Sequence, residues 1–156
     1  MLKPIGTINT SFISLQGMPI QPKGAPEALG KIVLFDEYAA GLKDLDGFSH
    51  IYLIYQFHKC KDEKLVVKPF MDETLRGVFA TRAPVRPNHI GLSIVKIENI
   101  HDNTIEVKGI DILDGTPLLD IKPYIANFDL IKSSESGWMQ ASNNEIENKK
   151  ADNRFT

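Results

Sequence analysis

The sequence has few residues that could build a disulfide, a metal centre or a membrane span. Its 156 residues include one cysteine, Cys60, which excludes an internal disulfide and suits a cytoplasmic protein. No apolar run of about 18 residues occurs, and residues 1–6 lack the apolar core of a secretory signal, so we expect no membrane contact. Because no His, Cys and Asp residues have the spacing of metal ligands, we predict no metal.

Strand–helix alternation and a glycine-rich nucleotide motif are also missing, which argues against a Rossmann-type fold. Short apolar or alternating stretches, separated by Gly and Pro, predict strands instead. They lie at residues 5–13, 32–35, 50–57, 65–70, 91–100, 105–108 and 118–121. We therefore predict a mainly all-β fold, a single-sheeted antiparallel β-barrel with one short helix and a polar C-terminal helix or tail.

Smaller features refine this arrangement. Asp36 is a candidate N-cap for a short helix that starts at residue 37 and ends near residues 45–47, and Asp102-Asn103 predicts the turn of a hairpin, with Gly109 as a candidate bulge. Polar residues dominate 138–150, where Trp138, Met139 and Ile146 could dock a helix or frayed tail on the barrel or on a second subunit. We divide the chain into a barrel domain, 1–132, and a C-terminal helix or flexible tail, 133–156.

The net charge of −2 and the pI of about 6.1 argue against a protein that coats nucleic acid without specificity. Basic residues nevertheless gather in one region, which is either a local basic patch or a set of solvated lysines. They are Lys59, Lys61, Lys64, Lys68, Arg76, Arg82 and Arg86. We expect the lysines to lower the pKa of Cys60.

Three segments mix glycine, proline and polar residues beside apolar strands, at residues 46–51, 77–93 and 113–124. Arginines in the second segment could bind a phosphate or carboxylate, or could pair with an internal Asp. Asn88 could bind an adenine edge or cap its own loop, and Leu92 could contact a ligand or belong to the core. In the third segment Asp114 is expected to start a turn by bonding its own backbone.

Other side chains in these segments could likewise bind a ligand or have a purely structural role. Asp120 and Lys122 share one face of a strand and could form an ion pair or contact a ligand. Tyr124 could stack on a base or donate its hydroxyl. His50 and His58 are candidate bases, although a histidine at a strand start is more often structural.

Long strings in these segments resemble the TrmO/TsaA-like family. They are "GVFATRAP-RPN-IGLS" over 77–93, "LDGTPLLDIKPY" over 113–124, "DGFSHIYLIYQFH" over 46–58 and "PIGTI" over 4–8. The likeness covers about residues 3–130. His89 stands where many relatives have proline, with little expected effect on the backbone. Longer relatives add a small C-terminal domain where this chain has a short tail.

The resemblance implies an S-adenosylmethionine (SAM)-binding β-barrel, a homodimer with the cofactor near the subunit interface. It implies methyl transfer to N6 of N6-threonylcarbamoyladenosine at position 37, in the anticodon loop of tRNA. We accordingly predict cofactor binding by Thr81, Arg82, Arg86, Asn88, His89, Ile90, Gly91, Leu92, Asp114, Gly115, Thr116, Pro117 and Leu118. We predict substrate binding by His50, Lys68, Asp120, Lys122 and Tyr124.

The sequence does not show which side chain, if any, acts as the catalytic base. Two other functions remain open: a SAM- or RNA-binding module without catalysis, and a SAM-dependent methyltransferase that acts on a small molecule. The first predicts SAM binding without turnover, and the second predicts activity without RNA and little salt dependence of substrate binding.

Overall fold

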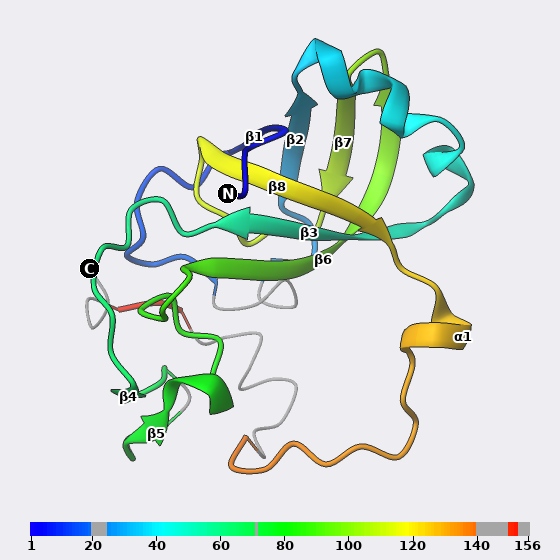
Figure 1. The fold of residues 1–156 in the computed structure, drawn as a ribbon. Coiled ribbons are helices and arrows are strands. Elements are labelled where there is room, and N and C mark those ends of the chain that lie inside the picture. The colour runs from blue at the N-terminus through cyan, green and yellow to red at the C-terminus, as the bar shows by residue number, and fades with distance from the viewer. Residues whose placement is uncertain (20–24, 71, 140–149, 153–156) are drawn as a thin grey trace.

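The computed structural model describes residues 1–19, 25–70, 72–139 and 150–152, and its centre is a closed antiparallel barrel (Figure 1). The strands follow the order β1-β2-β7-β6-β3-β8 around the barrel. The strands are β1 (Gly6–Thr10), β2 (Leu29–Leu34), β3 (His50–Gln56), β4 (Val66–Val67), β5 (Arg76–Gly77), β6 (Ile90–His101), β7 (Thr104–Lys108) and β8 (Thr116–Pro123). The helices are η2 (Asp36–Leu42), η3 (Leu45–Gly47), η4 (Val78–Ala80) and α1 (Ala126–Asp129). The predicted all-β barrel is confirmed.

Alternating side chains explain why these strands close into a barrel. In β3, Ile51, Leu53 and Tyr55 are buried, while the residues between them face outward. β-Branched and aromatic side chains suit a pleated, half-buried surface, and burying one face holds the register of each strand. The barrel interior is filled by fully buried side chains from every strand, among them Ile8, Ile32, Ile51, Leu53, Val95, Ile105, Val107 and Leu118.

Two irregularities bend the barrel strands. Between β3 and β8 the pairing shifts after Ile54, so that Tyr55 pairs with Leu118 and Leu119 is the extra residue. Between β6 and β7 the shift lies between Ile97 and Asn99. The predicted bulge at Gly109 is therefore wrong. Gly109 follows β7 with a φ of 76°, and its N–H donates to the carbonyl of Ala28 at 2.8 Å, so it turns the chain out of the strand.

The predicted hairpin and helix have different outcomes. β6 and β7 form the hairpin, and Asp102 in its turn has a φ of 53°. The element at Asp36–Leu42 is a 3-10 helix rather than an α-helix, and Asp36 is not its N-cap. The carboxylate of Asp36 instead accepts a hydrogen bond from Asn103 Nδ2 at 3.2 Å. This bond to the hairpin turn competes with capping.

A small subdomain lies beside the barrel and carries β4 and β5, at the lower left of Figure 1. The predicted strand at 65–70 is reduced to Val66–Val67, because Pro69 cannot donate to a ladder. A second apolar cluster holds this region together through Val67, Val78, Ala83 and Val85. It supports the loop after η4, which contributes to the site described below.

The C-terminal part of the prediction is only partly described. The one-turn helix α1 was not predicted, and Asp129 stabilises it by accepting a hydrogen bond from the Ile125 N–H at 2.9 Å. Trp138 docks beside η4, where its Nε1 donates to the Ala80 carbonyl at 2.7 Å. Residues 140–149, including Ile146, lie outside the described residues, so the polar helix or tail and the division at residue 132 stay predictions.

Candidate functional site

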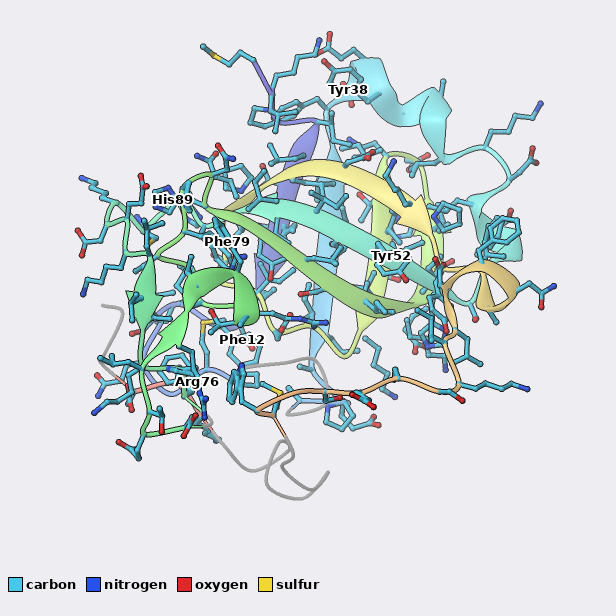
Figure 2. The ribbon with its side chains drawn as sticks, turned by 60° about the horizontal axis from the view of Figure 1, so that its bottom comes forward. Phe12, Tyr38, Tyr52, Arg76, Phe79 and His89 are labelled. Carbon is cyan, nitrogen blue, oxygen red and sulfur yellow. The ribbon has the colours of Figure 1, made fainter. Side chains whose placement is uncertain are left out.

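A cavity of about 330 Å³ opens at the end of the barrel where β3 ends and β6 begins. Figure 2 shows this end near the His89 label, whereas Tyr52 lies toward the opposite end of the sheet. Connections far apart in sequence form the walls, and Trp138 and Met139 add a segment from the C-terminal part. Most wall residues come from four stretches, 57–60, 81–86, 90–92 and 111–116, in which Val85, Asp114 and Gly115 lie off the walls. Leu15, Pro19, Pro69 and Phe70 also line the cavity. A volume of this size is within the range of small-molecule sites.

The loop at 81–86 is held by its own polar groups. Thr81 Oγ1 donates to the Val78 carbonyl at 2.8 Å and accepts the Ala83 N–H at 3.2 Å. Arg86 Nη1 donates to the carbonyls of Thr81 and Ala83 at 3.0 and 3.1 Å. Arg86 therefore stabilises the loop through backbone carbonyls, although its side chain also lines the cavity.

A chain of hydrogen bonds runs from the barrel interior to the cavity. Tyr55 Oη lies 3.0 Å from Ser93 Oγ, and Ser93 Oγ donates to Asp111 Oδ1 at 2.8 Å. Because a serine hydroxyl carries one proton, Tyr55 must be the donor to Ser93. Asp111 lies between the fully buried Ile110 and the nearly buried Ile112, so alternation directs its carboxylate away from the core and into the cavity.

Burial raises the pKa of both ionisable side chains in this hydrogen-bonded series, Asp111 and Tyr55. It raises the pKa of Asp111 from 3.8 to about 6, and the Ser93 hydrogen bond and the charge of Arg82 offset part of the effect. Burial also raises the pKa of Tyr55, with a further contribution from Asp111. Tyr55 thus stays a neutral donor, while Asp111 changes charge close to neutral pH.

Gly91 lets two aromatic rings fill the space beneath the cavity. The rings of Tyr55 and Phe57 pack edge to face with centroids 5.5 Å apart. A Cβ at position 91 would overlap the Tyr55 ring and lie 2.9 Å from Phe57 Cζ. Only glycine fits against these rings, so the "IGLS" glycine is required by packing as well as by its place on the cavity wall.

Charged groups surround an otherwise apolar cavity. The positive charge of Arg82 lowers the pKa of both Asp111 and Tyr55, which partly offsets the effect of burial. Lys59 lies on the neighbouring wall. Burial and Lys59 lower the pKa of His58, which favours the neutral ring. The expectation for Cys60 is wrong: burial raises its pKa, and the lowering effect of Lys64 is smaller. The cavity suits a ligand with a flat apolar ring, a cationic group and an anionic group.

About half of the predicted cofactor-binding residues meet at this cavity. Those on its walls are Thr81, Arg82, Arg86, Ile90, Gly91, Leu92 and Thr116. Leu118 is fully buried in the barrel core, and Asn88 and Pro117 lie off the walls. Gly115 also lies off them and has a φ of 79°, which forms the turn before β8.

Two further predicted cofactor residues have structural contacts. Asp114 does not bond its own backbone, because its carboxylate accepts the Thr10 N–H at 2.9 Å and joins the turn to β1. His89 Nε2 lies 2.8 Å from the Asp62 carbonyl. His89 has a φ of 44°, which a proline ring cannot adopt, so a proline here requires a different local backbone, while the expected small effect on the scaffold stays a prediction.

The predicted substrate residues do not line the cavity. His50 and Tyr124 pack edge to face, with ring centroids 6.4 Å apart, where β3 begins and β8 ends. Asp120 and Lys122 form the expected ion pair at 3.0 Å on the barrel exterior. Lys68 lies beside β4 and contacts Glu73 at 3.8 Å. Their role in substrate binding stays a prediction.

The sequence did not identify Tyr55, Ser93 or Asp111, the three residues that are linked by hydrogen bonds beside the cavity. Tyr55 and Ser93 occur in the family strings but look like ordinary strand residues. Asp111 precedes the third segment, and its signal is a single acidic residue between two isoleucines. Across the described ranges, no three His, Cys, Asp or Glu side chains group as metal ligands would. Among the helices of those ranges, none has the length and apolar character needed to cross a bilayer.

Comparisons with known proteins agree with this architecture. The family model described as the tRNA-methyltransferase O N-terminal domain matches residues 7–130. A Pyrococcus abyssi protein named as a probable S-adenosyl-L-methionine-binding protein is 45% identical over 98% of this chain and 83% of its own length. A Homo sapiens protein named tRNA (adenine(37)-N6)-methyltransferase is 36% identical over 83% of this chain and 31% of its own length.

The crystal structure of TrmO from Pseudomonas aeruginosa superimposes with a TM-score of 0.76 and 36% identity. It covers 90% of this chain, and this chain spans 62% of that structure. The family model covers the barrel and all four segments that form the cavity walls. The chain therefore belongs to the tRNA-methyltransferase O family, through its N-terminal domain.

Proposed function

We propose that this chain binds SAM in the cavity and transfers its methyl group to N6 of an adenosine in tRNA. The observation that carries the proposal is the cavity. Its mainly apolar walls come mostly from segments within the family match, and they hold the Asp111 carboxylate and the Arg82 guanidinium. The relatives named as SAM-binding and as tRNA (adenine(37)-N6)-methyltransferase support it.

The residues present fit SAM. Arg82 suits its carboxylate, and Leu92, Ile112 and Leu113 offer apolar surface to the adenine. When bound, SAM supplies an activated methyl group, so the protein mainly positions the acceptor nitrogen and excludes water. The Arg86 bonds hold the loop in its binding shape before the ligand arrives, which lowers the entropy cost of binding.

We further propose N6-threonylcarbamoyladenosine at position 37 as the acceptor. An anticodon-loop base leaves its stack more easily than a base in a duplex, and the threonylcarbamoyl carboxylate suits the basic side of the cavity. Lys59, Lys61 and Lys64 are exposed beside it and can contact phosphates. The cytoplasmic location inferred from the single cysteine stays a prediction.

The test measures SAM binding by titration calorimetry and then methyl transfer to tRNA with and without the threonylcarbamoyl group. We expect binding, and transfer that requires the modified tRNA and weakens as salt rises. Binding without transfer to any tRNA would favour a non-catalytic module. Transfer to a small molecule without RNA would favour a SAM-dependent methyltransferase that acts on small molecules.

Arg82→Ala is expected to weaken SAM binding by about 10- to 100-fold, because a hydrogen bond to a charged group is worth about 1.5–3 kcal/mol. Lys43→Ala is the control, since Lys43 is exposed after η2 and lies outside the cavity. Calorimetry on both variants checks the difference. Equal affinities would remove Arg82 from the cofactor site.

We also propose that a second copy covers the outer face of β6. Leu92 and Ile94 face outward there and are 47% and 38% exposed, in positions that polar residues usually occupy. Leu92 also lines the cavity, so a partner on this face would lie near the cofactor. We expect Ile94→Glu to shift the protein from dimer to monomer in light scattering, with Lys96→Glu, also exposed on β6, as the milder control. An unchanged dimer would contradict this surface.

A further inference from the structure

We propose that Asp111 is the catalytic base that takes the N6 proton of the acceptor adenosine. This inference rests on the proposed methyltransferase function. It starts from position: the Asp111 carboxylate lines the cavity, yet it belongs to the short connection between β7 and β8, outside the family strings recognised in the sequence.

The fold holds this carboxylate rigidly. Ile110 and Ile112 on either side are 0% and 2% exposed, so the backbone cannot turn Asp111 away from the cavity without removing one of them from the core. Ser93 Oγ donates to Oδ1 at 2.8 Å, and Tyr55 in turn donates to Ser93. Both donors come from the inner face of the barrel, on β6 and β3, and this arrangement orients a base.

The groups around Asp111 favour a base that is ionised at neutral pH and only weakly so at pH 5. Burial raises its pKa to about 6, while Ser93 and Arg82 favour its charged form. Tyr55 faces it from β3, and the other titratable side chains on the cavity walls are His58, Lys59, Cys60, Arg86 and Asp152. A base with a pKa near the working pH combines proton affinity with a large ionised fraction.

The proposed reaction couples methyl transfer to N6 with proton transfer to Asp111. The N6 lone pair forms the new bond to the methyl carbon while the carbon–sulfur bond breaks, and that electron pair stays on sulfur. N6 then loses its proton to a carboxylate oxygen of Asp111, which leaves S-adenosylhomocysteine, the methylated base and a neutral carboxylic acid. Water returns the acid to the carboxylate after product release, and no other reactant is needed.

His58 is the rival base, because its pKa is lowered and the neutral ring can accept a proton. It lies on the segment after β3, however, and its backbone N–H bonds to Gln56. Its ring also bonds the Gln56 backbone, which favours the charged form of the ring, whereas Asp111 is oriented by the side chains of Ser93 and Tyr55. The geometry favours Asp111.

The experiment compares wild type, Asp111→Asn, Asp111→Glu and His58→Gln in single-turnover methylation of modified tRNA between pH 5 and 8. Wild-type rates should rise through about pH 6 and then level. Asp111→Asn should lower the rate by about 100-fold or more and remove the rise, while SAM affinity changes by less than about tenfold. Asp111→Glu keeps a carboxylate, so it should restore part of the rate and part of its rise with pH.

A second readout needs no bound cofactor. Carbon-13 NMR of the ligand-free protein should show a carboxyl that titrates near pH 6 and disappears in Asp111→Asn. Ser93→Ala removes a hydrogen bond that favours the carboxylate, so it should move both this titration and the midpoint of the rate profile to higher pH.

Three results would overturn the proposal. Asp111→Asn could keep the wild-type rate and pH profile, or it could lose SAM binding, which would make Asp111 a cofactor ligand. Alternatively, His58→Gln could remove the rise while Asp111→Asn keeps it. In each case active wild-type protein leaves the proposed function intact, whereas wild type that binds no SAM or methylates no tRNA would refute both.

Discussion

Leu118→Ala is expected to lower the free energy of unfolding by about 2–5 kcal/mol, the cost of a large cavity in a packed core. Leu118 is 0% exposed and pairs with Gly6 on β1 and Tyr55 on β3, where β8 closes the barrel. Because strands on both sides hold the backbone in register, the site cannot collapse easily. We expect the cost to lie in the upper part of that range.

Leu92→Ala is the matched comparison. Leu92 is 47% exposed and lines the cavity, so losing its side chain should change stability by less than about 1 kcal/mol. It should weaken SAM binding by several-fold, since each buried methylene contributes about 0.8 kcal/mol. Urea unfolding and calorimetry on both variants check the contrast. Similar stability losses, or a larger affinity loss in Leu118→Ala when folded, would contradict this assignment.

These two leucines show where sequence analysis reaches its limit. Both belong to strings that match the family, and both were predicted as cofactor-binding residues. Their difference depends on which face of a strand turns inward: Leu118 shares the buried face with Thr116, whereas Leu92 stands between the buried Gly91 and Ser93 and faces outward. A period-two pattern read along the sequence gives the alternation but not which face meets the core, because that depends on the pairing partners.

Most of the barrel could be predicted because its determinants are local. Alternation in β6 and β7 and the Asp102-Asn103 turn define a hairpin without reference to the rest of the chain. The 3-10 character of Asp36–Leu42 could not be predicted this way. The Asp36 carboxylate accepts a hydrogen bond from Asn103, which lies far along the chain, so the residues around Asp36 do not reveal this partner.

The site was predicted in outline and missed in detail for the same reason. Arg82, Gly91 and Thr116 stand in long recognisable strings, and the structure brings them to one cavity. The Tyr55–Ser93–Asp111 chain joins residues from two strands and a connection, and only Asp111, between two isoleucines, stands out from its neighbours in sequence. Side-chain chemistry suggested His50 and Tyr124, but the antiparallel pairing places them where β3 begins, away from the cavity.

Asp111→Asn is expected to make the protein more stable at pH 8 and to remove part of its pH dependence. In wild type the folded state raises the pKa of Asp111 from 3.8 to about 6, so the folded protein holds this proton more tightly than the unfolded chain. Below about pH 4 both states are protonated and the group has no effect. As pH rises to about 6 the folded protein loses stability, by about 3 kcal/mol at most.

Urea unfolding between pH 4 and 8 measures this difference. The Asn side chain cannot ionise but still accepts a hydrogen bond from Ser93. The free energy of unfolding of the variant should therefore rise relative to that of wild type between pH 4 and 6, and the difference should stay constant above pH 6. Leu92→Ala changes no charge and should run parallel to wild type. Parallel curves for Asp111→Asn would mean that the carboxylate is well solvated. A clear gain, with a loss of methyl transfer, would show that the barrel keeps an ionised acid at this position at the expense of its own stability, as expected when a residue is retained for chemistry rather than for folding.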